Sequence, residues 1–426
     1  MSSILTNTSA MVALQTLKSI NTSLAKTQDE ISTGKAVGSA RDNSAVWAIS
    51  KVMESDVQGF KGISDSLALG SSTIAVARGA SEQITKLLGE IKEKIVASQE
   101  SNVDREKIQA DVVALRDQIG SIVSAAQFNG LNLLSNRKGG ATVADIVNNT
   151  GTGAGILGSG SVKVLSSLDR SGSNTVTASQ ITAVKGDLGT AARTAGTGTD
   201  IAATAITGAG AIAAGASGTL TVAGDIATAA RGGNRVIAGD TYAVAGLTGI
   251  TAPLSYVARD GDTVSDIARG LVDRINFEAQ KAGVAYTAKL DGTAGVQITN
   301  GTTAGITTTT AVNTGGTAGG GLALLGEINV TTENGAKAAL GAIEGLTQTA
   351  IRAAANFGTA QKRIDIQAEF VSKLVDSLKA GIGSLVDADM EAASAKLQAL
   401  QVQQQLGIQA LSIANQAPQN ILALFR

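Results

Sequence analysis

Apolar side chains recur every seven residues from Met53 to Ile95, and a second series fills the alternate positions. The first series is Met53, Phe60, Leu67, Ile74, Ser81, Leu88 and Ile95, and the second is Ile49, Ile63, Ala77, Ile84 and Ile91. A heptad repeat of this length predicts a long helix that buries one stripe against other helices. Gly70 and Asp56 are the weak points of this stripe.

Shorter segments on either side follow the same spacing. Before the long repeat, steps of three and four join Leu17, Ile20, Leu24, Thr27 and Ile31, and Gly34 then predicts a helix end. After it, the same steps join Ile108, Val112, Leu115, Ile119 and Ile122, preceded by a helix start signal at residues 101–104. Together these segments predict an N-terminal helical hairpin.

The C-terminal hundred residues repeat the pattern. One series is Ile364, Val371, Leu378 and Leu385, and the next is Met390, Ala393, Leu397, Leu400, Gln404, Gly407 and Leu411. Pro418 is predicted to end the last helix, because proline lacks the amide that a helix interior needs. We therefore expect the two ends of the chain to pair with each other or with neighbouring copies. Ordinary amphipathic helices in one bundle explain the periodicity equally well.

The segment from Leu397 to Phe425 contains eight glutamines and no charged residue. An exposed helix normally carries Lys and Glu on its solvent face, so this composition favours burial. Burial within an assembly of several copies explains it, and a helix docked inside one subunit is the alternative.

Between Gly139 and about Gly326 the sequence becomes rich in Gly, Thr, Ala and Val. Residues 161–165 and 175–184 are predicted strands, whereas residues 190–230 have few bulky side chains and predict a thin core. From Arg235 onward we expect strands around Tyr242, Tyr256, Tyr286 and Val296. A helix carrying Val264, Ile267, Leu271 and Ile275 is expected between the second and third of these strands.

Composition excludes most catalytic and metal-binding designs. The chain has no cysteine and no histidine, which removes thiol nucleophiles, disulfides and the commonest general base and metal ligand. We therefore expect no enzyme activity, cofactor or metal. A net charge of −1 gives no reason to expect nucleic acid or an anionic membrane as a partner. No secretory signal is visible near Met1, since the first basic residue is Lys18.

The stretch from Tyr256 to Ala268 resembles the opening of a LysM peptidoglycan-binding module. The simpler interpretation is a tight turn at Asp260–Gly261 with Asp262 or Thr263 capping a helix, which needs no ligand. A calcium loop is a third interpretation, but residues 263–266 lack its central glycine and no glutamate stands at its twelfth position. We favour the turn and cap.

Motifs at both ends resemble the bacterial flagellin family over roughly the first 140 and last 100 residues. The N-terminal motifs are Ile31–Lys35, Ser39–Ala45, Ala48–Ser50 and Ala126–Gly130 with Leu133 and Leu134. The C-terminal motifs are Asn356–Arg363, Asp387–Met390, Gln403–Gln405 and Ala414–Asn420 with Leu422 and Arg426. Several motifs in order at both termini make the resemblance specific.

The resemblance implies a structural subunit that polymerises into the flagellar filament. The expected fold is mainly α at both termini, with long antiparallel helices packed as a hairpin-shaped bundle and an inserted β-rich outer domain. The expected domains are residues 1–45 with 386–426, residues 46–140 with 327–385, and residues 141–326. The expected assembly interface is Leu17, Leu24, Ile31, Leu397, Leu400 and Leu411.

Family resemblance also implies partners and a location. We expect self-association, an export chaperone, and hook-associated junction and cap proteins. Export would proceed through the flagellar type III apparatus without a signal peptide, to an extracellular filament. A flagellin-like protein of the hook-to-filament junction is the first alternative, and a LysM-type wall-binding protein is the second.

Overall fold

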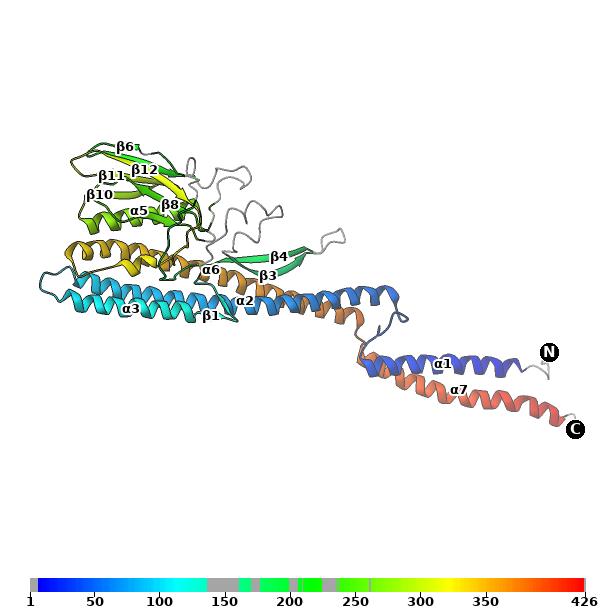
Figure 1. Ribbon diagram of the computed structural model, residues 1–426. Coiled ribbons are helices and arrows are strands. Elements are labelled where there is room, and N and C mark those ends of the chain that lie inside the picture. Colours follow the sequence, from blue (N-terminus) through cyan, green and yellow to red (C-terminus); the bar gives the residue numbers. More distant parts are fainter. Residues whose placement is uncertain are drawn as a thin grey trace. The chain divides into compact units, whose positions relative to one another are not determined.

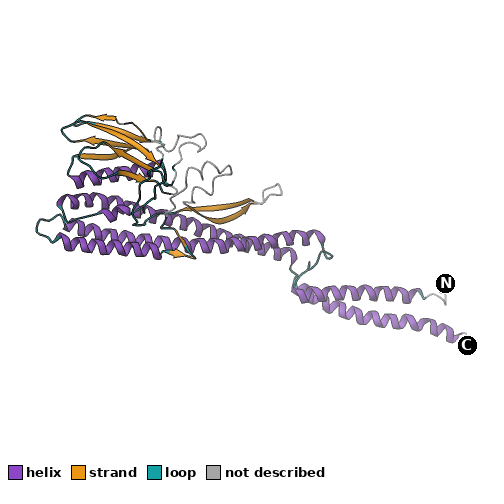
Figure 2. Cartoon of the chain, viewed as in Figure 1, coloured by secondary structure: helices purple, strands orange, loops and turns teal. Residues whose placement is uncertain are grey.

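The computed structural model describes residues 7–135, 161–169, 177–198, 206–208, 210–223, 236, 238–259 and 262–424. The chain forms two compact units, one of residues 1–65 with 369–426 and the other of residues 66–368 (Figure 1). Helices α2 (Ser44–Ala97) and α6 (Glu333–Val386) contribute residues to both units. Helices dominate both ends of the sequence, and most strands come from its middle (Figure 2). The predicted fold class is confirmed.

In the first unit, α1 (Thr8–Thr33) lies beside α7 (Met390–Leu424) (Figure 1). The Asn7 side chain caps α1 by accepting a hydrogen bond from Ala10 N. At the other end Gly34 adopts a left-handed conformation with φ 69°, which glycine takes at little cost. The predicted helix end at Gly34 is therefore confirmed.

The predicted end of the last helix at Pro418 is wrong, because α7 continues to Leu424. Proline cannot donate the helical hydrogen bond to the carbonyl four residues earlier, which is that of Ala414. That carbonyl instead accepts a hydrogen bond of 2.8 Å from Nδ2 of Asn7, which lies near the N-terminus of the same chain. A partner outside the helix thus replaces the donor that proline lacks.

Backbone hydrogen bonds tie the two helix-to-helix connections of this unit together. Ala36 N donates to Val386 O at 2.7 Å, and Ala388 N donates to Gly34 O at 2.9 Å. Lys35 and Asp387 form an antiparallel bridge between these contacts. The end of α1 and the start of α7 are held at a fixed register as a result.

In the second unit, α2, α3 (Arg105–Ala125) and α6 pack as a helical bundle (Figure 1). The predicted stripe of α2 is fully buried there at Leu67, Ile74, Ile84, Leu88, Ile91 and Ile95. Ile49, predicted to extend this stripe in the first unit, is instead 54% exposed. Asp104 caps α3 by accepting from Lys107 N, as the start signal predicts.

After α3 the chain turns through a tight hairpin of β1 (Gln127–Phe128) and β2 (Leu131–Asn132). Asn129 and Gly130 both have positive φ, at 50° and 76°, which suits a two-residue turn. Leu133 and Leu134 are buried directly after it. The family motif at Ala126–Gly130 therefore forms the exit from α3 into this hairpin.

A second hairpin, β3 (Ser161–Asp169) with β4 (Thr177–Val184), packs on the bundle. Its Val164 occupies the space above Gly70 of α2, where an added Cβ would lie 2.6 Å from both Val164 methyl groups. Gln367 Nε2 of α6 donates to Ser166 O at 2.9 Å. The predicted strands are confirmed, except that residues 175–176 lie outside the described residues.

Two four-stranded antiparallel sheets and α5 (Val264–Ala282) also belong to this unit. One sheet orders β10 (Tyr286–Asp291), β11 (Gly295–Asn300), β7 (Ser217–Val222) and β5 (Ile206–Gly208). The other orders β6 (Gly210–Ile212), β12 (Ile306–Asn313), β8 (Thr241–Ala245) and β9 (Leu254–Val257). The predicted strands around the tyrosines and Val296 and the predicted helix are all confirmed.

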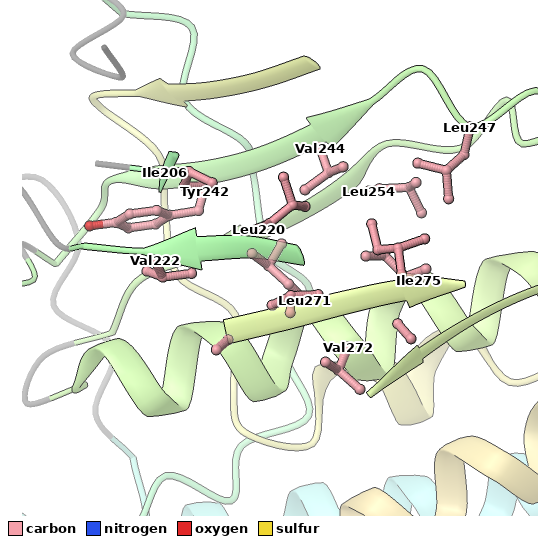
Figure 3. Packing of buried hydrophobic residues seen from close by; sticks show 14 of the residues in the cluster. Ile206, Leu220, Val222, Tyr242, Val244, Leu247, Leu254, Leu271, Val272 and Ile275 are labelled. Atoms are coloured by element: carbon pink, nitrogen blue, oxygen red, sulfur yellow. The ribbon is translucent and has the colours of Figure 1, made fainter. Parts of the chain in front are cut away.

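The core of this region lies between the sheets and α5, where Leu271, Val272 and Ile275 meet side chains of the strands (Figure 3). Ile206, Ile212, Leu220 and Val222 are all buried in it. The predicted thin core is therefore wrong for residues 206–222. Their alternating apolar side chains were obscured by intervening Gly, Ala and Thr, although every second residue of a strand suffices to cover a core.

The capping interpretation of the LysM-like segment is confirmed at Thr263. Its backbone N and Oγ1 both donate to the Asp266 carboxylate, which closes a capping box at the start of α5. The Asp260–Gly261 turn lies outside the described residues. Helix α5 continues to Ala282 and β10 follows it, without the short second helix of a LysM fold.

Candidate assembly surface

The structure brings the six predicted interface residues together in the seam between α1 and α7 of one chain. Leu400 is buried, and Leu17, Leu24, Ile31, Leu397 and Leu411 are half-buried. Gly407 allows close approach of the helices, since a Cβ there would lie 3.2 Å from Leu17 Cδ1. The six side chains therefore hold two helices of one chain against each other.

Polar contacts fix the register of this pair. Gln404 Nε2 donates to Asn21 Oδ1 at 2.8 Å near its middle, and Asn7 binds Ala414 O near its end. Thr27 is fully buried in the seam, and its hydroxyl donates to Ser23 O of its own helix. The pair is thus specified by hydrogen bonds as well as by apolar contacts.

A different set of apolar residues points away from the seam. Each is at least 55% exposed, and none belongs to the predicted interface. They are Met11, Val12 and Leu14 of α1, and Val402, Leu406, Ile408 and Ile413 of α7. The exposed remainder of α7 from residue 397 to 416 contains no charged side chain. In the sequence, the signal for this set was the presence of large apolar residues outside the seam positions.

Apolar surface of this kind normally marks a contact with another molecule. A lone helix pair has one seam, and a water-facing side needs charge for solubility. Here the outer side of α7 offers Gln and aliphatic side chains instead. This side of α7 is therefore suited to pack against another protein surface, because it combines apolar area with amide groups that form directional hydrogen bonds.

The second unit contains a cavity of about 290 Å³ lined by α5, α6 and the segments around Asp187 and Gly320. Its charged lining is Lys185, Arg193, Arg259, Arg269, Arg274 and Arg352 against Asp187, Asp262, Asp266, Asp273 and Glu327. Six basic and five acidic side chains nearly cancel. This balance gives the cavity no clear preference for a cation or an anion.

Most of these charges are paired with one another. Arg259 contacts the Tyr256 hydroxyl and the Asp262 carboxylate, and Tyr256 donates to Asp262 Oδ2 at 2.6 Å. Burial raises the pKa of Asp262, and the nearby Arg259 guanidinium partly offsets that increase. Arg274 pairs with both Glu278 and Glu327. Such ion-pair networks shift pKa values without implying catalysis.

Asp273 of α5 is one of the cavity's charges without such a pairing. Its carboxylate faces Gly345 of α6, and it forms no hydrogen bond or ion pair with any described residue. Burial raises its pKa, whereas Arg269 and Arg352 lower it by a smaller amount. Within the ranges described above, no group of three His, Cys, Asp or Glu residues could hold a metal ion, and no helix could cross a membrane.

Comparison with known proteins points to one family. The model of the bacterial flagellin N-terminal helical region matches residues 4–138, and that of the C-terminal helical region matches residues 340–425. Flagellin A of Rhizobium meliloti (strain 1021) is 36% identical over 431 residues, with all of both chains covered. Flagellin FljM of Caulobacter vibrioides is 29% identical over 429 residues, covering 100% of this chain and 99% of that protein.

Proposed function

Because the chain belongs to the bacterial flagellin family and is a structural subunit of the flagellar filament, we propose that the outward apolar faces of α1 and α7 join neighbouring subunits. The observation that carries this assignment is the exposure of Met11, Val12 and Leu14 on α1, and of Leu406 and Ile413 on α7. The six seam residues act indirectly, by holding the two helices in one register. No bond is made or broken in this role.

Apolar burial is large enough to drive such an assembly. Full burial of a large aliphatic side chain contributes about 1.5–3 kcal/mol, and these side chains have more than half of their area left to bury. With Val402 and Ile408 included, the seven exposed residues of this face therefore return roughly 5–10 kcal/mol per subunit before the cost of association. Exposed glutamines beside them add hydrogen bonds that orient the contact.

Leu406→Glu tests the outward face. A charge trapped in a closed apolar contact costs several kcal/mol, so we expect a critical concentration for polymerisation more than about a hundredfold higher than that of the natural chain. Sedimentation of polymer from purified subunits measures it. Leu406→Met keeps the apolar contact and should polymerise normally.

Two further variants make the test specific. Thr309→Glu places the same charge on an exposed residue of β12 and should leave the critical concentration unchanged. Leu397→Glu or Leu411→Glu disrupts the seam and should also block assembly. If Leu406→Glu polymerised as readily as Thr309→Glu, the outward face would not be a subunit contact.

The three-part domain division fits this role. We propose that residues 1–45 with 386–426 form the filament core, that residues 46–140 with 327–385 surround it, and that residues 141–326 form the outer surface. The compact units divide the helices elsewhere, after residues 65 and 368. Limited proteolysis of polymer should cut first within residues 141–326.

We further propose the partners that a filament subunit needs. These are an export chaperone before assembly, junction proteins at the hook and a cap at the growing tip, with export through the flagellar type III apparatus. Co-purification of the chain with its chaperone from cells that lack a hook would test the first. The junction-protein alternative is not favoured, because relatives matched over the full length of both chains are named flagellins.

A further inference from the structure

Pro418 interrupts the hydrogen-bond ladder of α7 six residues before the described end of that helix. Helix α7 nevertheless runs from Met390 to Leu424. A proline in a helix interior costs about 3 kcal/mol, partly because the carbonyl four residues earlier loses its donor. In α7 that carbonyl belongs to Ala414, so continuation of the helix needs a donor from elsewhere.

Asn7 supplies that donor from the first turn of α1. Its Nδ2 donates to Ala414 O at 2.8 Å, while its Oδ1 accepts from Ala10 N at 3.0 Å. The Asn7 amide thus caps α1 and, at the same time, supplies the hydrogen-bond donor that Ala414 O of α7 lacks. A serine can cap a helix equally well, but its side chain is shorter and lacks the second, amide arm.

We propose that Asn7 is a positioning residue through which α7 continues past Pro418 only while α1 is paired with it. Without α1 beside it, α7 would end near Pro418, as its sequence predicts. Residues 419–424 are therefore helical only when Asn7, at the other end of the chain, binds Ala414 O. The inference rests on the α1–α7 pair that the proposed function uses, and it does not depend on which face contacts other subunits.

A double-mutant cycle in the assembled filament tests this coupling. The variants are Asn7→Ser, Pro418→Ala and the two combined, and the readout is amide hydrogen exchange of residues 419–424 by mass spectrometry. Asn7→Ser should accelerate that exchange roughly two- to tenfold, the change that one lost hydrogen bond produces. In the Pro418→Ala background the new amide binds Ala414 O, so Asn7→Ser should then have no effect.

Asn43→Ser is the matched control, because Asn43 Oδ1 also accepts a hydrogen bond from the helix that follows it, at Val46 N. It should leave exchange at residues 419–424 unchanged in both backgrounds. If Asn7→Ser does not polymerise, restoration of polymer by Pro418→Ala supports the coupling, and failure to restore it overturns the proposal. Equal acceleration by Asn7→Ser in both backgrounds would overturn it too, because Asn7 would then act only as a cap.

The outcomes separate this inference from the proposed function. If Leu406→Glu polymerises normally, the outward face is wrong, yet the Asn7 and Pro418 effects can still be coupled. If the effects of Asn7→Ser and Pro418→Ala on exchange are additive, the coupling is wrong, but the proposal that the outward face contacts other subunits is unaffected.

Discussion

Gly70 is the single residue whose role is clearest from contacts that only the fold creates. Both methyl groups of Val164 would lie 2.6 Å from an added Cβ, and a β-branched side chain cannot move aside easily. Gly70→Ala should therefore lower the thermal midpoint of the second unit, since overpacking of about 1–3 kcal/mol exceeds the helix propensity gained, about 1 kcal/mol. Adding Val164→Ala should recover part of the loss. A higher midpoint for Gly70→Ala alone would show that the hairpin yields freely.

The burial of Asp273 leads us to predict an unusual pH dependence of folding stability. Its pKa in the folded chain is raised by burial, so above that pKa the charged carboxylate opposes folding. As the pH falls through the folded pKa, the folded state binds a proton before the unfolded state does, and the penalty disappears. Asp273→Asn should raise the thermal midpoint at pH 7 by roughly 2–4 °C, and the gain should vanish towards pH 3.

Asp111→Asn is the comparison for that variant. It removes an exposed ion pair with Lys94, which contributes little to stability, so the midpoint should change little at pH 7. A gain for Asp273→Asn that stayed constant between pH 7 and pH 3 would mean that the carboxylate charge is not its cause.

At the scale of elements, the terminal helices should form only in the polymer. In α1, four threonine hydroxyls donate hydrogen bonds to the carbonyls four residues earlier, and such bonds weaken helix propensity. They belong to Thr16, Thr22, Thr27 and Thr33. One seam holds the pair, and isolated helices of this length are marginal in water. We predict fast amide exchange in both helices of the free subunit and strong protection in the filament. Strong protection in the subunit would contradict this prediction.

The helices could be predicted from sequence because a heptad stripe encodes its own burial, and Leu67, Ile74 and Leu88 of α2 are fully buried as expected. Three features could not be predicted in the same way. Gly70 appears in the sequence as a gap in the apolar stripe, and only the fold shows that Val164 fills the space above it. Residues 206–222 have few bulky side chains, and only the fold shows that their apolar residues belong to the core between two sheets. Pro418 reads as a helix end because its compensating donor, Asn7, lies at the opposite terminus.

The predicted assembly residues illustrate the same limit at a larger scale. Leu17, Leu24, Leu397 and Leu400 could be chosen because they share the three-and-four spacing. Spacing identifies a seam, but it cannot say whether the partner helix belongs to the same chain. Once α1 and α7 pair, the residues left for other copies are those outside the seam, such as Leu406.

For the whole molecule, we predict that removal of residues 143–325 leaves a chain that still polymerises. The outward face and the α1–α7 seam lie outside that segment, and replacing an insertion by a short connection costs little chain entropy. The junction is also anchored without it, because Gln109 of α3 exchanges hydrogen bonds with Ile328 O and Val330 N.

That deletion has one foreseeable cost, which also supplies its control. Gly186 and Leu188 donate backbone hydrogen bonds to Leu133 and Leu134, so the deletion uncovers two buried leucines. Leu133→Ser with Leu134→Ser in the shortened chain should therefore reduce non-specific aggregation without changing the critical concentration. Electron microscopy distinguishes ordered filaments from aggregate. A shortened chain with native helix content that formed no filament would show that the middle of the chain takes part in assembly, because both terminal surfaces would still be present.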